Sequence, residues 1–292
     1  MIRPSMRRIG VLCLPLLGLL ATIPGCAPTE LLNRTVDRGG LIEQRDIAYG
    51  PLPRQAMDVW RPADGAAGLP VVVFFYGGSW QTGRRADYPF VAADLARRGH
   101  VVVVPDYRLY PEVRFPAFLR DAAAAVAAAR RMAPGWGGDP ARVVLMGHSA
   151  GAHIAAMLAL DPRWLAEAGD SRDRVAGVVG LAGPYDFLPI TGRRIREVFA
   201  DTADLSETQP ISFADRRAPP FLLLHGSDDS TVLPRNSQAL AARITRDGGR
   251  AELKLYDGVG HIGIVLGFSQ MFRDRAPVLD DSGAFIAGLP AR

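Results

Sequence analysis

Cysteine is almost absent from this chain. Cys13 and Cys26 are the only cysteines among its 292 residues, and both lie within the first 26 positions. Removal of that segment on export leaves no second thiol for an intramolecular disulfide. The sequence also has no cysteine and histidine cluster with the spacing of a metal site. We therefore expect neither a disulfide nor a bound metal.

Lysine is scarcer still, because Lys254 is the only one, and the basic side chains are almost all arginine. The formal net charge is +4, and the arginines are scattered along the sequence rather than gathered in one block. A nucleic-acid-binding surface normally concentrates its basic residues. The distribution therefore predicts solvated helix faces and no nucleic-acid partner.

The apolar run at the N-terminus is too short to cross a bilayer comfortably. Arg3, Arg7 and Arg8 precede this run, residues 9–23, which ends just before Cys26. A basic start followed by a short apolar run is typical of an export signal. The small residue before Cys26 resembles the lipobox of bacterial lipoproteins, in which the cysteine receives a diacylglyceryl group and becomes the mature N-terminus.

Three interpretations of this segment stay open, because Ile23 and Pro24 depart from the usual lipobox residues. The favoured one is lipid attachment at Cys26, which tethers the protein to the bacterial envelope on the periplasmic side. The alternatives are a plain secretory signal cut nearby and an apolar N-terminal helix of a cytoplasmic protein. Ala27 after the cysteine resembles the sequences of lipoproteins that are sorted to the outer membrane.

Apolar segments alternate with helical ones along the rest of the chain. Six segments are predicted as core strands: 71–75, 101–104, 143–146, 175–181, 221–225 and 251–256. Residues 46–49 and 57–60 are predicted to form an antiparallel hairpin. Helices are predicted at 88–98, 116–132, 150–160, 236–246 and 282–287. Near-continuous apolar strands indicate a mostly parallel sheet that helices cover on both faces.

The domain organisation follows from this pattern. We predict an export signal over residues 1–26, a polar lead over 27–45 and a single α/β domain over 46–292. The stretch 183–220 contains five prolines and no clear strand, so we expect it to form a small insertion beside the site.

The most informative segment is 143–151, an apolar strand that runs through Gly-His-Ser-Ala-Gly into a small-residue helix. This arrangement holds a nucleophilic serine, here Ser149, on a tight turn. A serine needs an adjacent base that a carboxylate orients, and in this context the chain order is serine, acid, histidine. That order leaves His261 as the base. It disfavours the four other histidines: His100, His148, His153 and His225.

Two aspartates compete for the acid. They follow the strand at 221–225, as Asp228 and Asp229. The segment resembles the H-G-x-x-D-x-x-V pattern of hydrolases, in which the fifth residue is the acid. This favours Asp229, and Asp228 stays as the alternative, with a role in the turn as its other interpretation.

An acyl-transfer site also needs donors for the developing oxyanion. The backbone N–H of Ala150, directly after the serine, is one candidate. Gly77 and Gly78 are the others, because glycines directly after a core strand let backbone N–H groups approach a substrate. Trp80 in the same loop either lines the substrate pocket or packs in the core.

The loop Tyr-Gly-Gly-Ser-Trp resembles the H-G-G-x-W loop of α/β-hydrolase carboxylesterases, the group of hormone-sensitive lipase, kynurenine formamidase and isoprenylcysteine methylesterase. The resemblance extends through residues 106–109, 115–117, 138–142 and 147–151. It implies the α/β-hydrolase fold and no cofactor. It also implies a triad and an oxyanion hole made of these residues: Ser149, Asp229, His261, Gly77, Gly78 and Ala150. Tyr76 departs from the family pattern, in which a histidine usually braces the loop.

These features predict a serine carboxylesterase that hydrolyses small or short-chain esters. The lead and the insertion are short and leave little chain for a large lid, which argues against a true lipase. An arylformamidase is one alternative, although an export signal argues against it. A non-catalytic envelope lipoprotein is the other, and a complete triad in the right order argues against that.

Overall fold

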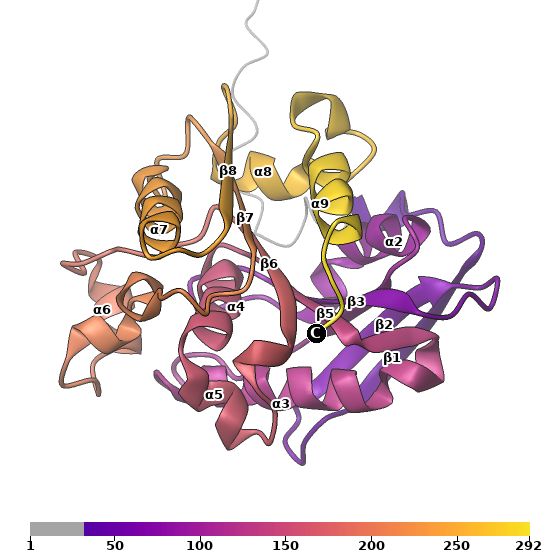
Figure 1. Ribbon diagram of the computed structural model, residues 1–292, viewed down its shortest axis with the longest axis horizontal. Helices are drawn as coiled ribbons and strands as arrows, with labels where there is room; N and C mark the ends of the chain where they lie inside the picture. The colour runs from indigo at the N-terminus through magenta and orange to yellow at the C-terminus, as the bar shows by residue number, and fades with distance from the viewer. Residues whose placement is uncertain (1–31) are drawn as a thin grey trace, which may run out of the picture.

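An eight-stranded sheet forms the centre of the computed structural model, which describes residues 32–292 (Figure 1). Its strand order is β1-β2-β4-β3-β5-β6-β7-β8. All neighbours from β4 to β8 are parallel, and β2 pairs antiparallel with β1 and β4. The predicted α/β class and mostly parallel sheet are confirmed. The predicted export signal and Cys26 lie outside the described residues.

The strands are β1 Leu41–Ala48, β2 Ala56–Pro62, β3 Leu69–Phe75, β4 Val101–Pro105, β5 Gly138–His148, β6 Val175–Leu181, β7 Phe221–Gly226 and β8 Ala251–Tyr256. The predicted hairpin is present, but β1 begins at Leu41, five residues before its predicted start. It is an edge strand with three charged or polar residues in a row exposed to solvent, so the apolar pattern is weak there.

The longer helices are α2 Pro89–Arg97, α3 Ala117–Met132, α4 Ala150–Leu160, α7 Arg235–Arg246 and α9 Val278–Ala287. They correspond to the five predicted helices, with α9 beginning four residues earlier than predicted. Three further helices escaped prediction: α5 Pro162–Glu167, α6 Arg193–Val198 and α8 His261–Leu266. Each has six residues, which is too short for a helical repeat to emerge from the sequence.

Short 3₁₀ helices complete the described elements: η1 Arg85–Asp87, η2 Ala133–Trp136, η3 Arg172–Arg174, η4 Leu205–Thr208, η5 Pro210–Phe213 and η6 Arg273–Arg275. The stretch predicted as an insertion, 183–220, thus holds α6, η4 and η5. None of the helices in residues 32–292 is both long and apolar enough to cross a membrane.

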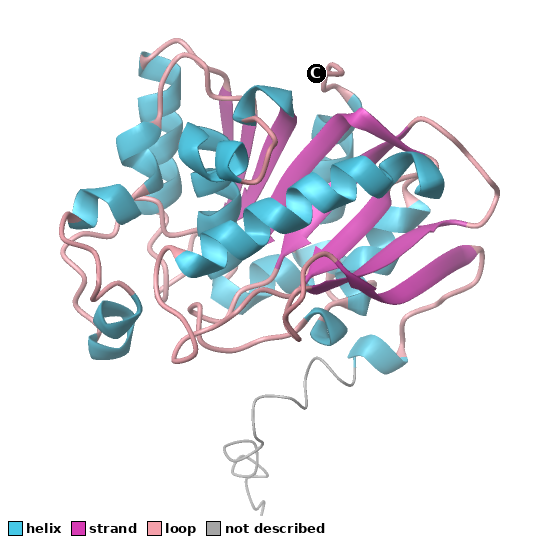
Figure 2. Ribbon diagram, turned by 90° about the horizontal axis from the view of Figure 1, so that it is seen from below, coloured by secondary structure: helices cyan, strands magenta, loops and turns pink. Residues whose placement is uncertain are grey.

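Helices lie on both sides of the sheet (Figure 2). One side carries α2 and α9, which touch each other, and the other carries α3, α4 and α5, which also pack together. The strands β4 and β6 are buried along their whole length. Burial on both faces explains why these strands are almost entirely apolar in the sequence.

Candidate active site

Ser149 stands on the sharp turn between β5 and α4. Its φ of 55° is a conformation that residues other than glycine rarely adopt. A Cβ on Gly147 would come within 2.3 Å of the Gly151 backbone, and one on Gly151 within 2.0 Å of the Phe75 carbonyl oxygen. Both flanking glycines are therefore required by the turn, and strain of this kind is common at functional sites.

The ends of three elements bring Ser149, His261 and Asp229 together. Asp229 follows β7, and His261 is the first residue of α8, after β8. The His261 Nε2 lies 2.9 Å from the Ser149 hydroxyl, and its Nδ1 lies 2.7 Å from Asp229 Oδ2. With a proton on Nδ1 donated to the carboxylate, Nε2 is free to accept the proton of the serine hydroxyl.

Asp229, rather than Asp228, reaches His261. The Asp229 side chain is fully buried, and its Oδ1 accepts the backbone N–H groups of Thr231 and Val232 at 2.9 Å each. The Asp228 carboxylate instead accepts the Ser227 hydroxyl on the exposed side of the loop. Hydrogen bonds to the ionised form hold the Asp229 carboxylate in one orientation toward the imidazole.

His225 closes the end of β7, in agreement with its interpretation as a structural residue. Its Nε2–H donates to the Val232 carbonyl at 2.8 Å, and its Nδ1 accepts the Ser237 hydroxyl at 2.7 Å. Burial lowers the pKa of this imidazole, so it is neutral at neutral pH. It thereby fixes the loop that carries Asp229.

His148 supports the base, a role that its position in the motif did not reveal. Its Nε2–H donates to the backbone carbonyl of His261 at 3.0 Å, and the two rings lie 4.8 Å apart. Burial, together with the nearby His261, lowers the pKa of His148 to about 3. A neutral ring therefore holds the His261 backbone without adding a second charge beside the base.

The glycine loop, residues 77–83, lies directly against Ser149. A Cβ on Gly77 would come within 3.1 Å of the Ser149 Cβ, and one on Gly78, where φ is 123°, within 2.2 Å of the Thr82 carbonyl oxygen. The backbone N–H of Gly77 lies beside the Tyr88 hydroxyl. Burial raises the pKa of this tyrosine to about 12, and the Gly77 N–H limits the rise.

The next two residues of this loop also carry strain. Ser79 and Trp80 have φ values of 54° and 60°. Both line a cavity of about 430 Å³, which Ser149 and Ala150 reach as well. The N–H of Ala150 belongs to the first turn of α4, where backbone donors lack helical partners and the helix dipole favours negative charge.

The cavity beside Ser149 is mostly apolar. Its remaining walls come from 184–195, which contributes Phe187 and Ile190, and from 230–236. Trp80 both lines the cavity and packs in the core, because it is 3% exposed and meets the rings of His153 and Phe199 at 5.0 Å. The predicted insertion thus supplies one wall of the cavity.

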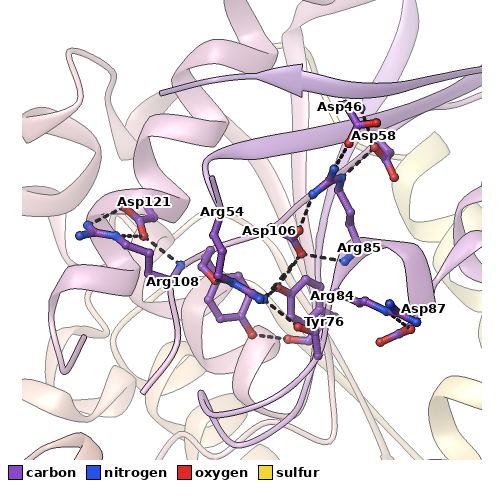
Figure 3. A network of polar contacts seen from close by, with 12 residues as sticks. Asp46, Arg54, Asp58, Tyr76, Arg84, Arg85, Asp87, Asp106, Arg108 and Asp121 are labelled. Carbon is purple, nitrogen blue, oxygen red and sulfur yellow. Dashed lines mark hydrogen bonds and ion pairs between the residues drawn. The ribbon is translucent and has the colours of Figure 1, made fainter. Parts of the chain in front are cut away.

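The polar residues after β4 form a structural cluster (Figure 3). Arg108 Nε and Nη2 donate to the two oxygens of Asp121 at 2.8 Å each, and Gln55 donates to the same carboxylate. This agrees with the interpretation of Asp121 as a buried hydrogen-bonding residue.

Within residues 32–292, no group of three or more histidine, cysteine or acidic side chains could hold a metal ion.

His153 makes the stability of the fold sensitive to acid. It is fully buried, its Nε2–H donates to the Thr208 carbonyl at 2.8 Å, and burial lowers its pKa to about 4. Below pH 6.5 the His153 imidazole binds a proton in the unfolded chain but stays neutral in the folded chain. The free energy of unfolding therefore falls as the pH falls toward 4. We expect this histidine to contribute a loss of about 3 kcal/mol at pH 4.

Urea unfolding at pH 7, 5.5 and 4 checks this prediction. His153→Gln keeps a donor for the Thr208 carbonyl and cannot titrate, so its loss of stability between pH 6.5 and 4 is expected to be smaller by the same amount. Parallel pH profiles for the wild type and the variant would contradict the prediction.

The sequence of this chain matches the model of a known protein family. The BD-FAE model matches residues 57–244, which is more than half of the chain and includes Ser149 and Asp229. The chain belongs to the BD-FAE family. This family membership agrees with the resemblance to α/β-hydrolase esterases that the sequence motifs indicated.

Curated relatives of this family member include two esterases. The chain is 30% identical over 272 residues to the probable isoprenylcysteine alpha-carbonyl methylesterase ICMEL1 of Arabidopsis thaliana, covering 82% of this chain and 57% of that protein. It is 34% identical over 241 residues to esterase LipC of Mycobacterium tuberculosis, covering 75% and 60%. The chain therefore spans about three fifths of the length of these relatives.

Solved structures agree with the fold. Esterase 2 of Thermogutta terrifontis, in its apo form, matches with a TM-score of 0.71 over 88% of this chain and 98% of that one. The two sequences are 24% identical, so this match bears on the fold alone.

Proposed function

We propose that this protein is a serine carboxylesterase with Ser149 as nucleophile, His261 as base and Asp229 as the acid that orients it. The observation that carries the proposal is the continuous chain of hydrogen bonds from the Ser149 hydroxyl through both ring nitrogens of His261 to a buried carboxylate. Family membership and relatives that are themselves named esterases, such as esterase LipC, support the same reaction class.

In the proposed reaction His261 takes the proton of Ser149 as the hydroxyl attacks the ester carbonyl. The resulting imidazolium is stabilised by Asp229 and then protonates the leaving alcohol. His261 next removes a proton from water, which attacks the acyl-enzyme and releases the acid. The chemistry uses side chains and backbone donors of this chain, and the proposal includes no cofactor.

The tetrahedral intermediate places a negative charge on the former carbonyl oxygen. We propose that the N–H of Ala150 and backbone N–H groups of the loop that begins with Gly77 and Gly78 stabilise it, chiefly that of Gly78, because the Gly77 N–H faces the Tyr88 hydroxyl. Removal of one such donor typically costs about 100- to 1000-fold in rate. The N-terminus of α4 adds a favourable dipole at the same point.

The proposed substrates are small esters with short acyl chains. A cavity of about 430 Å³ beside Ser149 has room for a short chain, and a solved form of Thermogutta terrifontis esterase 2 holds butyrate. We expect p-nitrophenyl acetate and butyrate to give the highest kcat/KM, and the laurate ester to be at least about tenfold poorer.

A panel of p-nitrophenyl esters of increasing chain length, with formylkynurenine added, measures this preference. A maximum at laurate would indicate a lipase instead. A higher kcat/KM for formylkynurenine than for both acetate and butyrate esters would indicate an arylformamidase.

We further propose that the protein is exported and carries a lipid on Cys26. The basic start, the short apolar run and the small residue before the cysteine support this location. Cys26→Ala is expected to move the protein from the membrane to the soluble fraction of cells, and globomycin to cause the precursor to accumulate. No change in either experiment would favour a plain secretory signal.

A further inference from the structure

Tyr76 stands directly before the glycine loop, and both ends of the residue are held (Figure 3). Its side chain is fully buried, and its hydroxyl donates to Asp106 Oδ1 at 2.8 Å while accepting from Arg54 Nη2 at 2.8 Å. Its backbone carbonyl accepts the Tyr107 hydroxyl at 2.7 Å. The residue therefore has no remaining freedom to turn, and it lies outside the cavity beside Ser149.

Arg54 connects this tyrosine to two loops. It comes from the turn between β1 and β2, and its Nη2 also donates to the Gly83 carbonyl at 2.7 Å. Its Nε donates to the Tyr107 carbonyl at 2.8 Å. Gly83 ends the glycine loop and packs so closely that a Cβ there would come within 2.8 Å of the Tyr76 ring. A single guanidinium thus joins the beginning and the end of the loop.

Asp106 holds the hydroxyl from the other side. Its Oδ1 accepts the backbone N–H of Arg85 at 2.8 Å as well as the Tyr76 hydroxyl, and its Oδ2 pairs with the Arg85 guanidinium. Arg85 is itself fixed by a hydrogen bond to Asp58 at 2.8 Å. The carboxylate is therefore an immobile acceptor. The Tyr76 hydroxyl, which both donates and accepts, bridges it to Arg54, whose Nη2 also lies 3.8 Å from Asp106 Oδ1.

The held carbonyl of Tyr76 constrains the loop that follows. The peptide bond is planar, so a fixed carbonyl direction also fixes the direction of the Gly77 N–H and the course of the chain into the loop. That loop passes within contact of Ser149 and continues through the strained Ser79 and Trp80. Such strain persists only where the surroundings impose it.

We propose that Arg54 and Asp106 are positioning residues that act through the Tyr76 hydroxyl to hold loop 77–80 in the conformation that stabilises the oxyanion. This inference rests on the proposed esterase function. Arg54 lies in a hairpin turn at the edge of the sheet, and its described contacts include neither Ser149 nor His261. It acts on the chemical step only through the Tyr76 hydroxyl.

Tyr76→Phe tests the proposal, because it removes only the hydroxyl. We expect kcat for p-nitrophenyl butyrate to fall about 10- to 100-fold, while KM changes by less than about twofold. A trifluoromethyl ketone forms a tetrahedral oxyanion adduct with a serine. We expect its inhibition constant to rise by the same factor as kcat/KM falls. 1-Butanol, which is neutral and carries no oxyanion, is expected to bind with unchanged affinity.

Tyr256→Phe is the matched control. It removes a tyrosine hydroxyl that likewise donates to a carboxylate, that of Asp281 at 2.6 Å, but it lies on β8 away from the glycine loop. We expect this variant to keep wild-type kcat. Arg54→Met provides a second route, and the double variant with Tyr76→Phe is expected to lose less than the product of the two single losses, because both remove the same bond.

The outcomes separate this proposal from the proposed function. Suppose that the wild type hydrolyses esters and labels with a fluorophosphonate, but that Tyr76→Phe and Arg54→Met leave kcat and the inhibition constant unchanged and lower only the melting temperature. The positioning role is then wrong, and the proposed esterase function stands. A wild type that neither labels nor hydrolyses any ester overturns both.

Discussion

Ser149→Ala is expected to lower kcat for p-nitrophenyl butyrate by about 10⁴- to 10⁶-fold, and to abolish covalent labelling by a fluorophosphonate. The alanine keeps the backbone turn but removes the hydroxyl that lies 2.9 Å from Nε2 of His261. The activity that remains reflects the oxyanion donors and substrate binding alone. Steady-state kinetics and gel-based labelling of the purified protein measure both effects.

Ser230→Ala is the matched control for this variant. Ser230 lines the same cavity and is exposed, but it makes no described hydrogen bond to His261. We expect it to label and turn over like the wild type. A wild type that fails to label, or equal labelling of Ser149→Ala, would indicate that the fold serves only for binding and that the proposed esterase function is wrong.

Asp229→Asn is expected to lower kcat by about 10⁴-fold with little change in KM. An asparagine amide donates its N–H to Nδ1 of His261, which moves the ring proton to Nε2 and leaves no acceptor for the Ser149 hydroxyl. The loss therefore comes from the wrong tautomer rather than from a displaced ring. Nitrogen-15 NMR of the imidazole reports the tautomer directly, alongside the kinetics.

Asp228→Asn supplies the comparison, since it makes the same chemical change one residue away. Its carboxylate bonds to Ser227 on the exposed side of the loop, so we expect activity within about twofold of the wild type. A large loss for Asp228→Asn together with a small one for Asp229→Asn would show that the acid had been assigned to the wrong residue.

The strand, the Gly-His-Ser-Ala-Gly turn and the helix after it selected Ser149, and chain order then left His261 as the base. The positions of strands in the sequence already imply which loops meet at one edge of a parallel sheet. The choice between Asp228 and Asp229 rested on spacing and resemblance. The structure shows why Asp229 is the one that reaches His261. Of these two aspartates, the loop after β7 points Asp229 inward, where two backbone N–H groups donate to its carboxylate. Adjacent residues in a turn face different directions, and local sequence does not specify which faces the site.

Contacts across long sequence separations escaped prediction. His148 filled the variable position of the serine motif, and only folding brings its ring to the backbone of His261, 113 residues later. Arg54 lies in a hairpin turn, and nothing near it in the sequence indicates that its guanidinium reaches the Tyr76 hydroxyl. The short helix α8, which begins at His261, was also missed because six residues show no repeat.

The sequence by itself determined the class of the fold, the order of the strands along the chain and the identity of the residues that could carry an acyl transfer. These depend on apolar periodicity, on glycines that a turn requires, and on chain order, all of which are local or sequential properties. Only the tertiary structure decided how Tyr76 is held and which groups line the cavity beside Ser149. Both depend on directions of side chains from separate elements, and those directions are set when the helices and loops pack against the sheet.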